Sequence, residues 1–274
     1  MSLTKEAIQE LVQNGHVPDF LKNLENADVQ SQLILVPDNC SLKDLESHQE
    51  FRNNLRGTFK TTLIPDFVSY VADNNGEGAQ TFVEAKEMSA ETIFDIGTKE
   101  KAGHQRHRAR VALVQTAPYK SLLRLDGSKL DQRAMAEHLE DWSEFFQAFD
   151  GDGNVIEMHK AAAAIRDLDF THTRGSTSSV GDFAQRQSQY EEMATKTKED
   201  LVLPAVFKFT CVPYNSLKEH CFELRLSVIR NETLILRIKR LEEEQEKIAQ
   251  EFLESVKEQL TAAKVEMPIY IGEF

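Results

Sequence analysis

The chain has 274 residues and a net charge of −13, from 32 Lys and Arg residues against 45 Asp and Glu residues. This length can bury a sizeable core as one large domain or two small ones, and 41% hydrophobic with 28% charged residues is an ordinary globular composition. The charge argues against general binding of nucleic acid by the whole surface. Because no apolar run approaches the ~20 residues of a membrane helix, no membrane partner is expected.

The cysteines and the first residues indicate the compartment. Cys40, Cys211 and Cys221 form no CxxC pair and are odd in number, which favours reduced thiols over a disulfide framework or a zinc site. The start "MSLTKEAIQELVQNG" lacks a basic segment followed by an apolar block, so no signal peptide is expected. Both features predict a cytoplasmic protein.

The first part of the chain has the pattern of alternating short helices and strands. Residues 1–28 are expected to form a short helical region, in which Ile8, Leu11 and Val12 share one face. The pattern then predicts, in chain order, a strand at Ser31–Pro37, a helix capped by Ser41, a strand at Gly57–Leu63, a helix opened by Pro65, a turn at Asn74–Gly78, and strands in "TFVEAKEM" and "ETIFDIG".

Two helices are predicted in the centre of the chain. The first runs from Asp131 to Phe149 and carries a stripe at helical spacing that we interpret as core: Met135, Leu139, Trp142, Phe146 and Phe149. The second runs roughly from Val155 to Leu168 and is expected to bury Val155, Met158, Ala162 and Ile165. Residues 171–190, rich in Ser, Thr and Gly, are expected to form a mobile loop.

The last third has the pattern of strands followed by a long helix. "VFKFTCV", "CFELRLSV" and "TLILRIKR" each place hydrophobic residues on one face with period two. A helix is predicted from Glu242 to Lys264, and "MPIYIGEF" is expected to close a sheet as an edge strand after Pro268. We therefore expect one α+β domain over residues 1–274, with a mixed, largely antiparallel sheet packed with several helices and a long C-terminal helix.

A basic island interrupts the acidic sequence. Lys99 to Arg133 contains nine basic and three acidic residues, a local charge of +6 that leaves −19 for the rest of the chain. Its most basic part is "AGHQRHRARV", from Ala102 to Val111. On a strand with period two, one face would carry His104, Arg106, Arg108 and Arg110, and the other His107, Ala109, Val111 and Leu113.

Two interpretations of this basic face stay open. Guanidinium groups suit phosphate and carboxylate, so the face and the preceding Lys101 are candidates for binding a polyanion such as nucleic acid. Alternatively, the arginines are solvated and pair with acidic side chains close by. A metal site is the weakest option, because His104 and His107 would point to opposite faces and the arginines would repel a cation.

Other motifs give weaker signals. Asp150–Ala161 begins like a calcium loop, but it has Val155 and Ala161 where Gly and Glu are needed, so we expect a turn between two helices. "DLDFTH" (Asp167–His172) could assist a divalent metal and makes a metal-dependent hydrolase a further alternative. No nucleophile-elbow pattern surrounds the hydroxyls that follow His172, which are Ser176, Ser178 and Ser179. Walker A, GxGxxG and HExxH motifs do not occur, so no catalytic residue, cofactor or metal is assigned.

Two segments resemble a known family. "FDIGTKEKAGHQRHRARVALVQTAPYKSLLRLDGSKLDQRAMAEHLEDW" resembles the central block of the YfdQ-like family of unknown function, and "PAVFKFTCVPYNSLKEHCFELRLSVI" resembles its C-terminal block. Members of that family occur in bacteriophage and prophage genomes. The resemblance implies a phage origin and the cytoplasm of the bacterial host. It implies no activity and no role for any single residue.

Two classes of function remain besides the hydrolase. The first is a non-enzymatic phage accessory protein that binds a polyanion through the basic face. The second is a self-assembling protein, such as a shell-like oligomer, or a host-directed protein, for example an inhibitor of a host defence. Its basic residues would contact an acidic host protein or another subunit. A homo-oligomer is expected, and its candidate seam is a stripe on the C-terminal helix: Ile248, Phe252, Val256 and Leu260. The same stripe equally suits packing on the protein's own sheet.

Overall fold

The computed structural model describes residues 50–51, 54–168, 201–229 and 233–274. The chain divides into two units, Met1–Asn53 and Asn54–Phe274, and every helix and strand described below belongs to the second. The expected helical region at 1–28, the strand at 31–37, the helix capped by Ser41 and the loop at 171–190 lie outside the described residues. That residues 1–274 form a single domain therefore stays a prediction.

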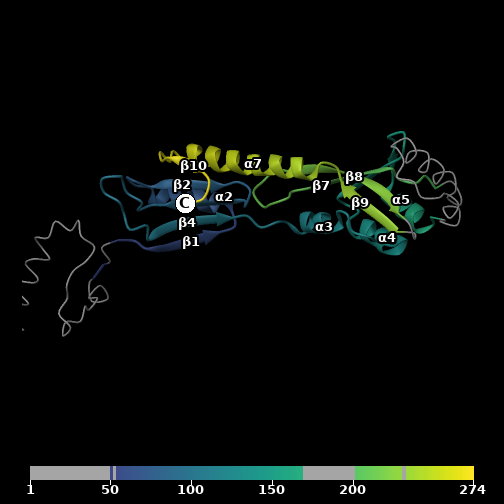
Figure 1. The fold of residues 1–274 in the computed structure, drawn as a ribbon, viewed down its shortest axis with the longest axis horizontal. Helices are drawn as coiled ribbons and strands as arrows, with labels where there is room; N and C mark the ends of the chain where they lie inside the picture. Colours follow the sequence, from purple (N-terminus) through teal and green to yellow (C-terminus); the bar gives the residue numbers. More distant parts are fainter. Residues whose placement is uncertain (1–49, 52–53, 169–200, 230–232) are drawn as a thin grey trace, which may run out of the picture. The chain divides into compact units, whose positions relative to one another are not determined.

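The first sheet has five strands in the order β1-β4-β3-β2-β10. They are β1 (Gly57–Thr61), β4 (His107–Ala112), β3 (Ser89–Ile93), β2 (Gln80–Glu84) and β10 (Ile269–Ile271). β1 pairs with β4 and β10 pairs with β2 in parallel, whereas the two inner pairs are antiparallel. β10 is the expected edge strand after Pro268, and in Figure 1 the chain returns to the sheet from the end of the last helix to form it.

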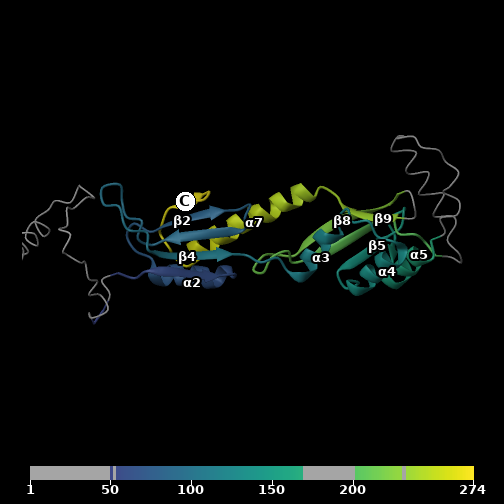
Figure 2. The same ribbon diagram turned by 60° about the horizontal axis from the view of Figure 1, so that its bottom comes forward.

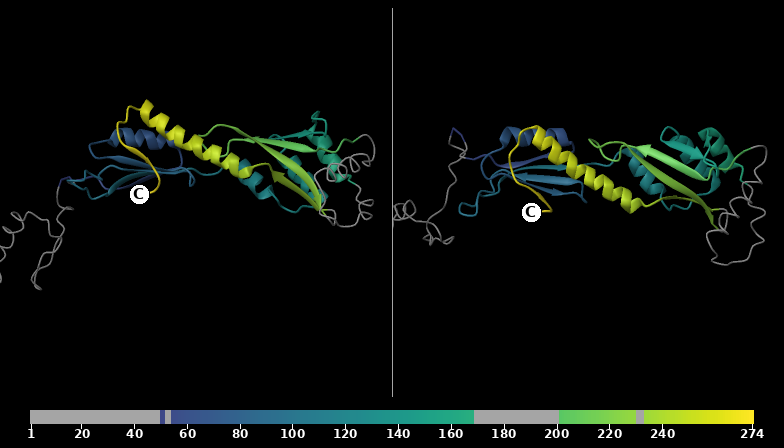
Figure 3. Two further views of the ribbon diagram at one scale, coloured as in Figure 1. Left: turned by 45° about the horizontal axis from the view of Figure 1, so that its top comes forward. Right: turned by 90° about the horizontal axis from the view of Figure 1, so that it is seen from above.

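Two helices pack on one face of this sheet. They are α2 (Ile64–Asn74), which has Pro65 in its first turn as expected, and α7 (Leu241–Ala262), which begins with three acidic residues. Figure 3 shows them side by side above the strands. Their apolar stripes meet the strand residues that point the same way, such as Val83, Ala109 and Val111, so this face is the core of the first sheet.

The second sheet is antiparallel throughout, in the order β6-β5-β7-β8-β9. Its strands are β6 (Val155–Ile156), β5 (Phe146–Phe149), β7 (Val206–Cys211), β8 (His220–Ile229) and β9 (Thr233–Ile238), and most are visible in Figure 2. Most of the apolar residues predicted to share a face in the last three strands are buried, with Phe207, Phe209, Phe222 and Leu224 all 0% exposed, whereas Val228 is partly buried.

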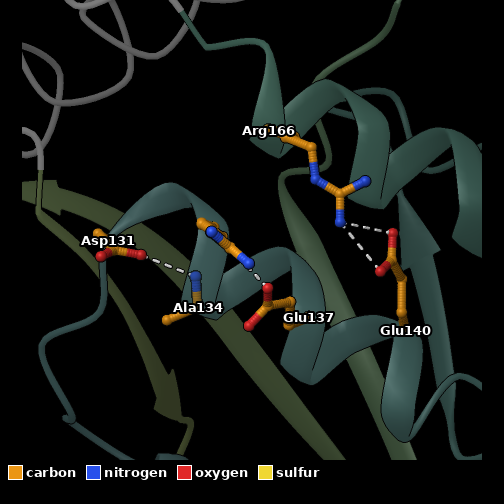
Figure 4. A network of polar contacts seen from close by, with 6 residues as sticks. Asp131, Ala134, Glu137, Glu140 and Arg166 are labelled. Atoms are coloured by element: carbon orange, nitrogen blue, oxygen red, sulfur yellow. Dashed lines mark hydrogen bonds and ion pairs between the residues drawn. The ribbon is translucent and has the colours of Figure 1, made fainter.

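Helices α4 (Gln132–Asp141) and α5 (Met158–Arg166) pack together beside the second sheet. The Asp131 side chain caps α4 by accepting a hydrogen bond of 2.7 Å from the backbone nitrogen of Ala134. Arg166 of α5 pairs with Glu140 of α4 at 2.9 Å, so the two helices are joined at their outer surface (Figure 4). An exposed pair of this kind contributes little stability, so the contact between the helices depends on buried Met135, Leu139 and Ile165.

The long helix predicted from Asp131 to Phe149 was wrong in its second half. The helix ends at Asp141, and Phe146 begins a strand in which it lies opposite Phe209 of β7. The helical spacing of apolar residues continues by chance beyond the helix, into a segment that is more stable when it pairs in a sheet. The next predicted helix was also too long, because Val155 belongs to β6 and is 71% exposed.

The fold class is α+β, as predicted, but the strands form two sheets where one was expected. One helix was not predicted: α3 (Ala117–Leu125), which begins at Thr116, whose hydroxyl accepts from the backbone nitrogen of Tyr119. Among the helices of the described ranges, none combines the length and the apolar character that crossing a bilayer requires.

The stripe on α7 lies inside the protein. Ile248, Phe252, Val256 and Leu260 are at most 1% exposed and belong to the core cluster. Packing on the protein's own sheet, the alternative left open by the sequence, is therefore what the structure shows. A second copy could reach these side chains only if α7 left its place.

A buried imidazole in α4 predicts that acid destabilises the fold. The Nε2 atom of His138 is buried and has no hydrogen-bond partner in the part of the chain that the structure describes, and burial lowers the pKa of the ring from its ordinary 6.5, against the opposing charge of Asp141. The folded state therefore binds fewer protons than the unfolded state once the pH falls to about 6.5, so the free energy of unfolding falls as the pH is lowered through this value. His107, whose pKa burial also lowers, acts in the same direction.

Urea unfolding at several pH values checks this prediction. His138→Gln should flatten the pH dependence, although the part due to His107 remains. His104→Gln, which removes an exposed imidazole, is the matched control and should leave the slope of the free energy of unfolding against pH unchanged. Equal slopes in the parent and in His138→Gln would contradict the prediction.

Candidate binding surface on the first sheet

The basic segment adopts the alternation predicted for a strand. In β4, His107, Ala109 and Val111 are buried, whereas Arg108 is half-buried and Arg110 is exposed. The buried side chains face α2 and α7, so the arginines point to the opposite face of the sheet. We call this opposite face the open face.

Asp95 fixes the point at which β4 begins. Its two carboxylate oxygens accept hydrogen bonds from the backbone nitrogens of Arg106 and His107, at 2.9 and 3.0 Å. Burial acts to raise the pKa of this carboxyl, but the backbone hydrogen bonds outweigh burial, and the pKa is lowered. Gly103 lies so close to the Asp95 carbonyl that a Cβ at this position would be 1.9 Å from the oxygen. The turn before β4 is therefore tightly defined.

His107 is a buried structural residue. Its Nε2 atom forms a hydrogen bond of 2.9 Å with the Tyr70 hydroxyl, and its ring centroid is 4.4 Å from that of Phe94. His104 is exposed and lies before the strand. The two histidines are thus not brought together, and the described residues contain no group of three His, Cys, Asp or Glu that could hold a metal ion.

Arg108 is already engaged within the sheet. Its guanidinium lies 3.5 Å from a carboxylate oxygen of Glu91 on β3, and its Nε donates to the Gln105 carbonyl at 3.0 Å. The Arg108 side chain is only 31% exposed. The interpretation that the arginines pair with acids close by therefore holds for this residue.

Three other basic side chains, unlike Arg108, have no acidic partner within the described ranges. Lys60 of β1 lies directly opposite Arg110 in the parallel pair, and Arg106 continues the alternation before the strand. All three are exposed, and none forms an ion pair within the described ranges. We call Lys60, Arg106 and Arg110 the basic strip. Of the other residues predicted for this site, Lys101 and His104 are exposed in the preceding loop.

The charge and polarity of the side chains on the open face change from one edge of the sheet to the other. The strand registers place five residues in one row across the sheet, in the order Lys60, Arg110, Glu91, Phe82 and Tyr270. Charge is therefore positive over β1 and β4 and negative or aromatic beyond them. Lys60 was not among the predicted site residues. The alternation in the sequence predicted the strand that carries Lys60, but not which strand would lie beside it.

A shallow hollow of about 170 Å³ lies in the aromatic part of the open face. Phe82 and Phe274 line it, with their ring centroids 4.8 Å apart, and the ring of Tyr270 stacks beside Phe82 at 5.5 Å between centroids. Its rim carries the carboxylates of Glu84, Glu87, Glu91 and Glu273, against a single guanidinium from Arg110. The hollow therefore suits a cationic or apolar group and disfavours an anion.

The first residues of the segment resembling a calcium loop, 150–154, form a tight turn between β5 and β6. One carboxylate oxygen of Asp150 accepts from the backbone nitrogens of Asp152 and Asn154, and the other accepts from the Asn154 side chain. These hydrogen bonds lower the pKa of Asp150, the side-chain bond from Asn154 most of all. The expected turn is present, but it joins two strands where two helices were predicted.

We predict that this turn binds no calcium at physiological concentrations. The Asp150 oxygens are already used as acceptors, and no glutamate closes the loop at the twelfth position. Isothermal titration with calcium chloride should give no heat above dilution, in the parent and in Asp150→Asn alike. Micromolar affinity that Asp150→Asn removes would contradict this.

The hydrolase alternative stays a prediction, because most of its residues are outside the described ranges. Of the Asp167–His172 cluster, only Asp167 and Leu168 are described, at the end of α5. The remaining residues, and Ser176, Ser178 and Ser179, lie outside the described ranges.

The family model described as "Uncharacterized conserved protein (DUF2303)" matches residues 4–274. The chain belongs to this family. No curated protein and no solved structure matches the chain. The DUF2303 match spans the whole first sheet, so the strip and the hollow both lie within the family's domain.

Proposed function

We propose that this protein is a non-enzymatic phage accessory factor that binds a polyanion, such as nucleic acid, through the basic strip. The observation that carries the proposal is that Lys60, Arg106 and Arg110 are exposed and without ion pairs in the described ranges, while Arg108 beside them is neutralised. A rigid sheet holds Lys60 and Arg110 in register, which suits contacts to successive phosphates.

The electrostatics favour a local site over the whole surface. Free guanidinium groups bind phosphate through two parallel N–H donors, and each phosphate contact releases counterions from the nucleic acid. Three contacts would give a slope of about −2.7 for log K against log salt on duplex DNA. The net charge of −13 confines such binding to the strip, so affinity should fall steeply with salt.

The setting in which this binding occurs is part of the same proposal. The resemblance to the YfdQ-like family supports a phage or prophage protein that acts in the cytoplasm of the bacterial host. An acidic host protein is the other partner that the strip would fit, because its carboxylates offer the same charge-assisted hydrogen bonds.

Fluorescence anisotropy with a labelled oligonucleotide tests the strip. The triple variant Lys60→Gln, Arg106→Gln, Arg110→Gln should bind at least tenfold more weakly at low salt, irrespective of sequence, and its salt slope should be flatter by about 2 to 3. Because Gln keeps the side chains polar and the sites are exposed, circular dichroism should show an unchanged fold.

The matched control is Lys120→Gln, Lys129→Gln, Lys264→Gln. It removes the same charge from exposed positions away from the strip, and two of these positions belong to the basic island. Affinity close to that of the parent is expected. The proposal fails if the parent binds no oligonucleotide at low salt, or if both triple variants lose affinity equally.

A further inference from the structure

We propose that a second copy of this chain docks on the open face, with the basic strip of each copy lying against the acidic half of the other. The acidic half is defined here as Glu84, Glu87 and Glu273, around the hollow lined by Phe82. Docking of this kind would also cover the strip, so self-association and polyanion binding would exclude each other. Only that competition rests on the proposed function; the docking itself does not.

The first observation is that neither helix packed on this sheet covers the open face, although Ile93 at the end of β3 is buried there beside Arg108. α2 and α7 both lie on the other face (Figure 3). On the open side Arg110 is exposed, and Tyr270 and Phe274 are 49% and 55% exposed although their rings pack on Phe82. A cluster of exposed aromatic rings with a charged rim is typical of an interaction surface.

The second observation is the charge arrangement on that one face. Lys60 and Arg110 lie over β1 and β4, while Glu84 and Glu273 lie over β2 and the residues after β10. Between them the pair of Arg108 with Glu91 neutralises the centre. A face that is positive on one half and negative on the other is complementary to itself, because the same patch can meet its own copy after rotation.

The symmetry of the contact follows from the strand order. A two-fold axis parallel to β3 places β1 and β4 of one copy opposite β2 and β10 of the other, so each contact between opposite charges is made twice. An axis perpendicular to the strands would place the strip against the strip, and like charges would repel. The same rotation brings Arg110 of one copy toward the aromatic hollow of the other, where a guanidinium gains cation–π and carboxylate contacts.

The acidic half of the open face suits a second copy and not a nucleic acid that continues beyond the strip. A phosphate chain that continued past the strip would meet four carboxylates around the hollow, which oppose it. The contact area is small for a stable dimer. Five strands about 4.8 Å apart and about five residues long give only about 400 Å² per copy, against the ~800 Å² of a standard interface. We therefore expect a weak dimer, half dissociated at ~10–100 µM and weakened by salt.

Complementary charge reversal tests the docking. Sedimentation velocity of the full chain over a range of concentrations at low salt should show the parent dimerising. The acid variant Lys60→Glu, Arg110→Glu and the basic variant Glu84→Lys, Glu273→Lys should each be monomeric, because like charges then face each other. An equimolar mixture of the two should restore the dimer, which mere damage to the fold could not do. Lys120→Glu, Lys129→Glu is the matched control and should dimerise like the parent.

Three outcomes would overturn the docking. They are a parent that stays monomeric at all concentrations, an oligomer that survives both charge reversals, and a mixture of the two variants that remains monomeric. The oligonucleotide separates this proposal from the previous one. The variant Glu84→Lys, Glu273→Lys should lose self-association yet bind the oligonucleotide at least as well as the parent, so either proposal can fail while the other stands.

Discussion

Phe252→Ala is expected to lower the free energy of unfolding by about 3–5 kcal/mol, the cost of emptying the site of a large buried aromatic ring. Phe252 is 0% exposed and lies in the stripe with which α7 enters the core. Truncation removes apolar contacts and leaves a cavity that the surrounding sheet and α2 can fill only in part. Urea denaturation followed by circular dichroism measures the change.

Glu254→Ala is the matched control on the same helix. Glu254 is exposed, and among the described residues its side chain only accepts a hydrogen bond from Gln250 one turn earlier, so its loss should cost less than ~0.5 kcal/mol. The more drastic pair Phe252→Asp, Val256→Asp should unfold the chain, since it buries two carboxylates without partners. Smaller particles with full helical content in that pair would show instead that the stripe joins subunits.

Asp95→Ala is expected to destabilise the protein by about 2 kcal/mol, somewhat below the sum for two hydrogen bonds to a charged acceptor because water can replace part of them. The carboxylate holds the backbone nitrogens of Arg106 and His107, where the chain enters β4. For a domain of this size the change corresponds to a fall in Tm of about 4–8 °C, measurable by differential scanning fluorimetry.

Asp95→Asn makes the test more specific. The amide keeps one acceptor oxygen and loses the other, so its Tm should lie between those of the parent and Asp95→Ala. Glu100→Ala removes the same charge from an exposed position in the same loop and should leave the Tm unchanged. If Asp95→Ala has the same Tm as the parent, the carboxylate does not hold the start of β4 in place.

Local pattern predicted the basic face but not what lies beside it. The alternation of Arg108 and Arg110 with buried Ala109 and Val111 is a property of the segment alone, and the structure reproduces it. The neighbours Lys60 and Glu91 come from strands far away in the chain, and their registers depend on packing that a single sequence does not display. One of the predicted arginines therefore proved to be paired, and an unpredicted lysine joined the strip.

The errors in the helices have the same physical origin. Phe146 continued the helical spacing of Met135 and Leu139, yet it gains more by lying opposite Phe209 in the second sheet. The missed helix α3 did have a local signal, since Thr116 followed by Pro118 is a common helix start. The stripe on α7 was visible in the sequence, but whether a sheet or another subunit covers it is decided by the rest of the fold.

Lysine footprinting tests the central claim, that the basic strip is the binding surface, most directly. The protein is treated with an acetylating reagent in the absence and presence of a saturating oligonucleotide, and each lysine is followed by mass spectrometry. We expect the oligonucleotide to protect Lys60, while Lys120, Lys129 and Lys264 react equally in both samples. Equal modification of Lys60 with and without the bound oligonucleotide, or protection of Lys120 and Lys129 in its place, would contradict it.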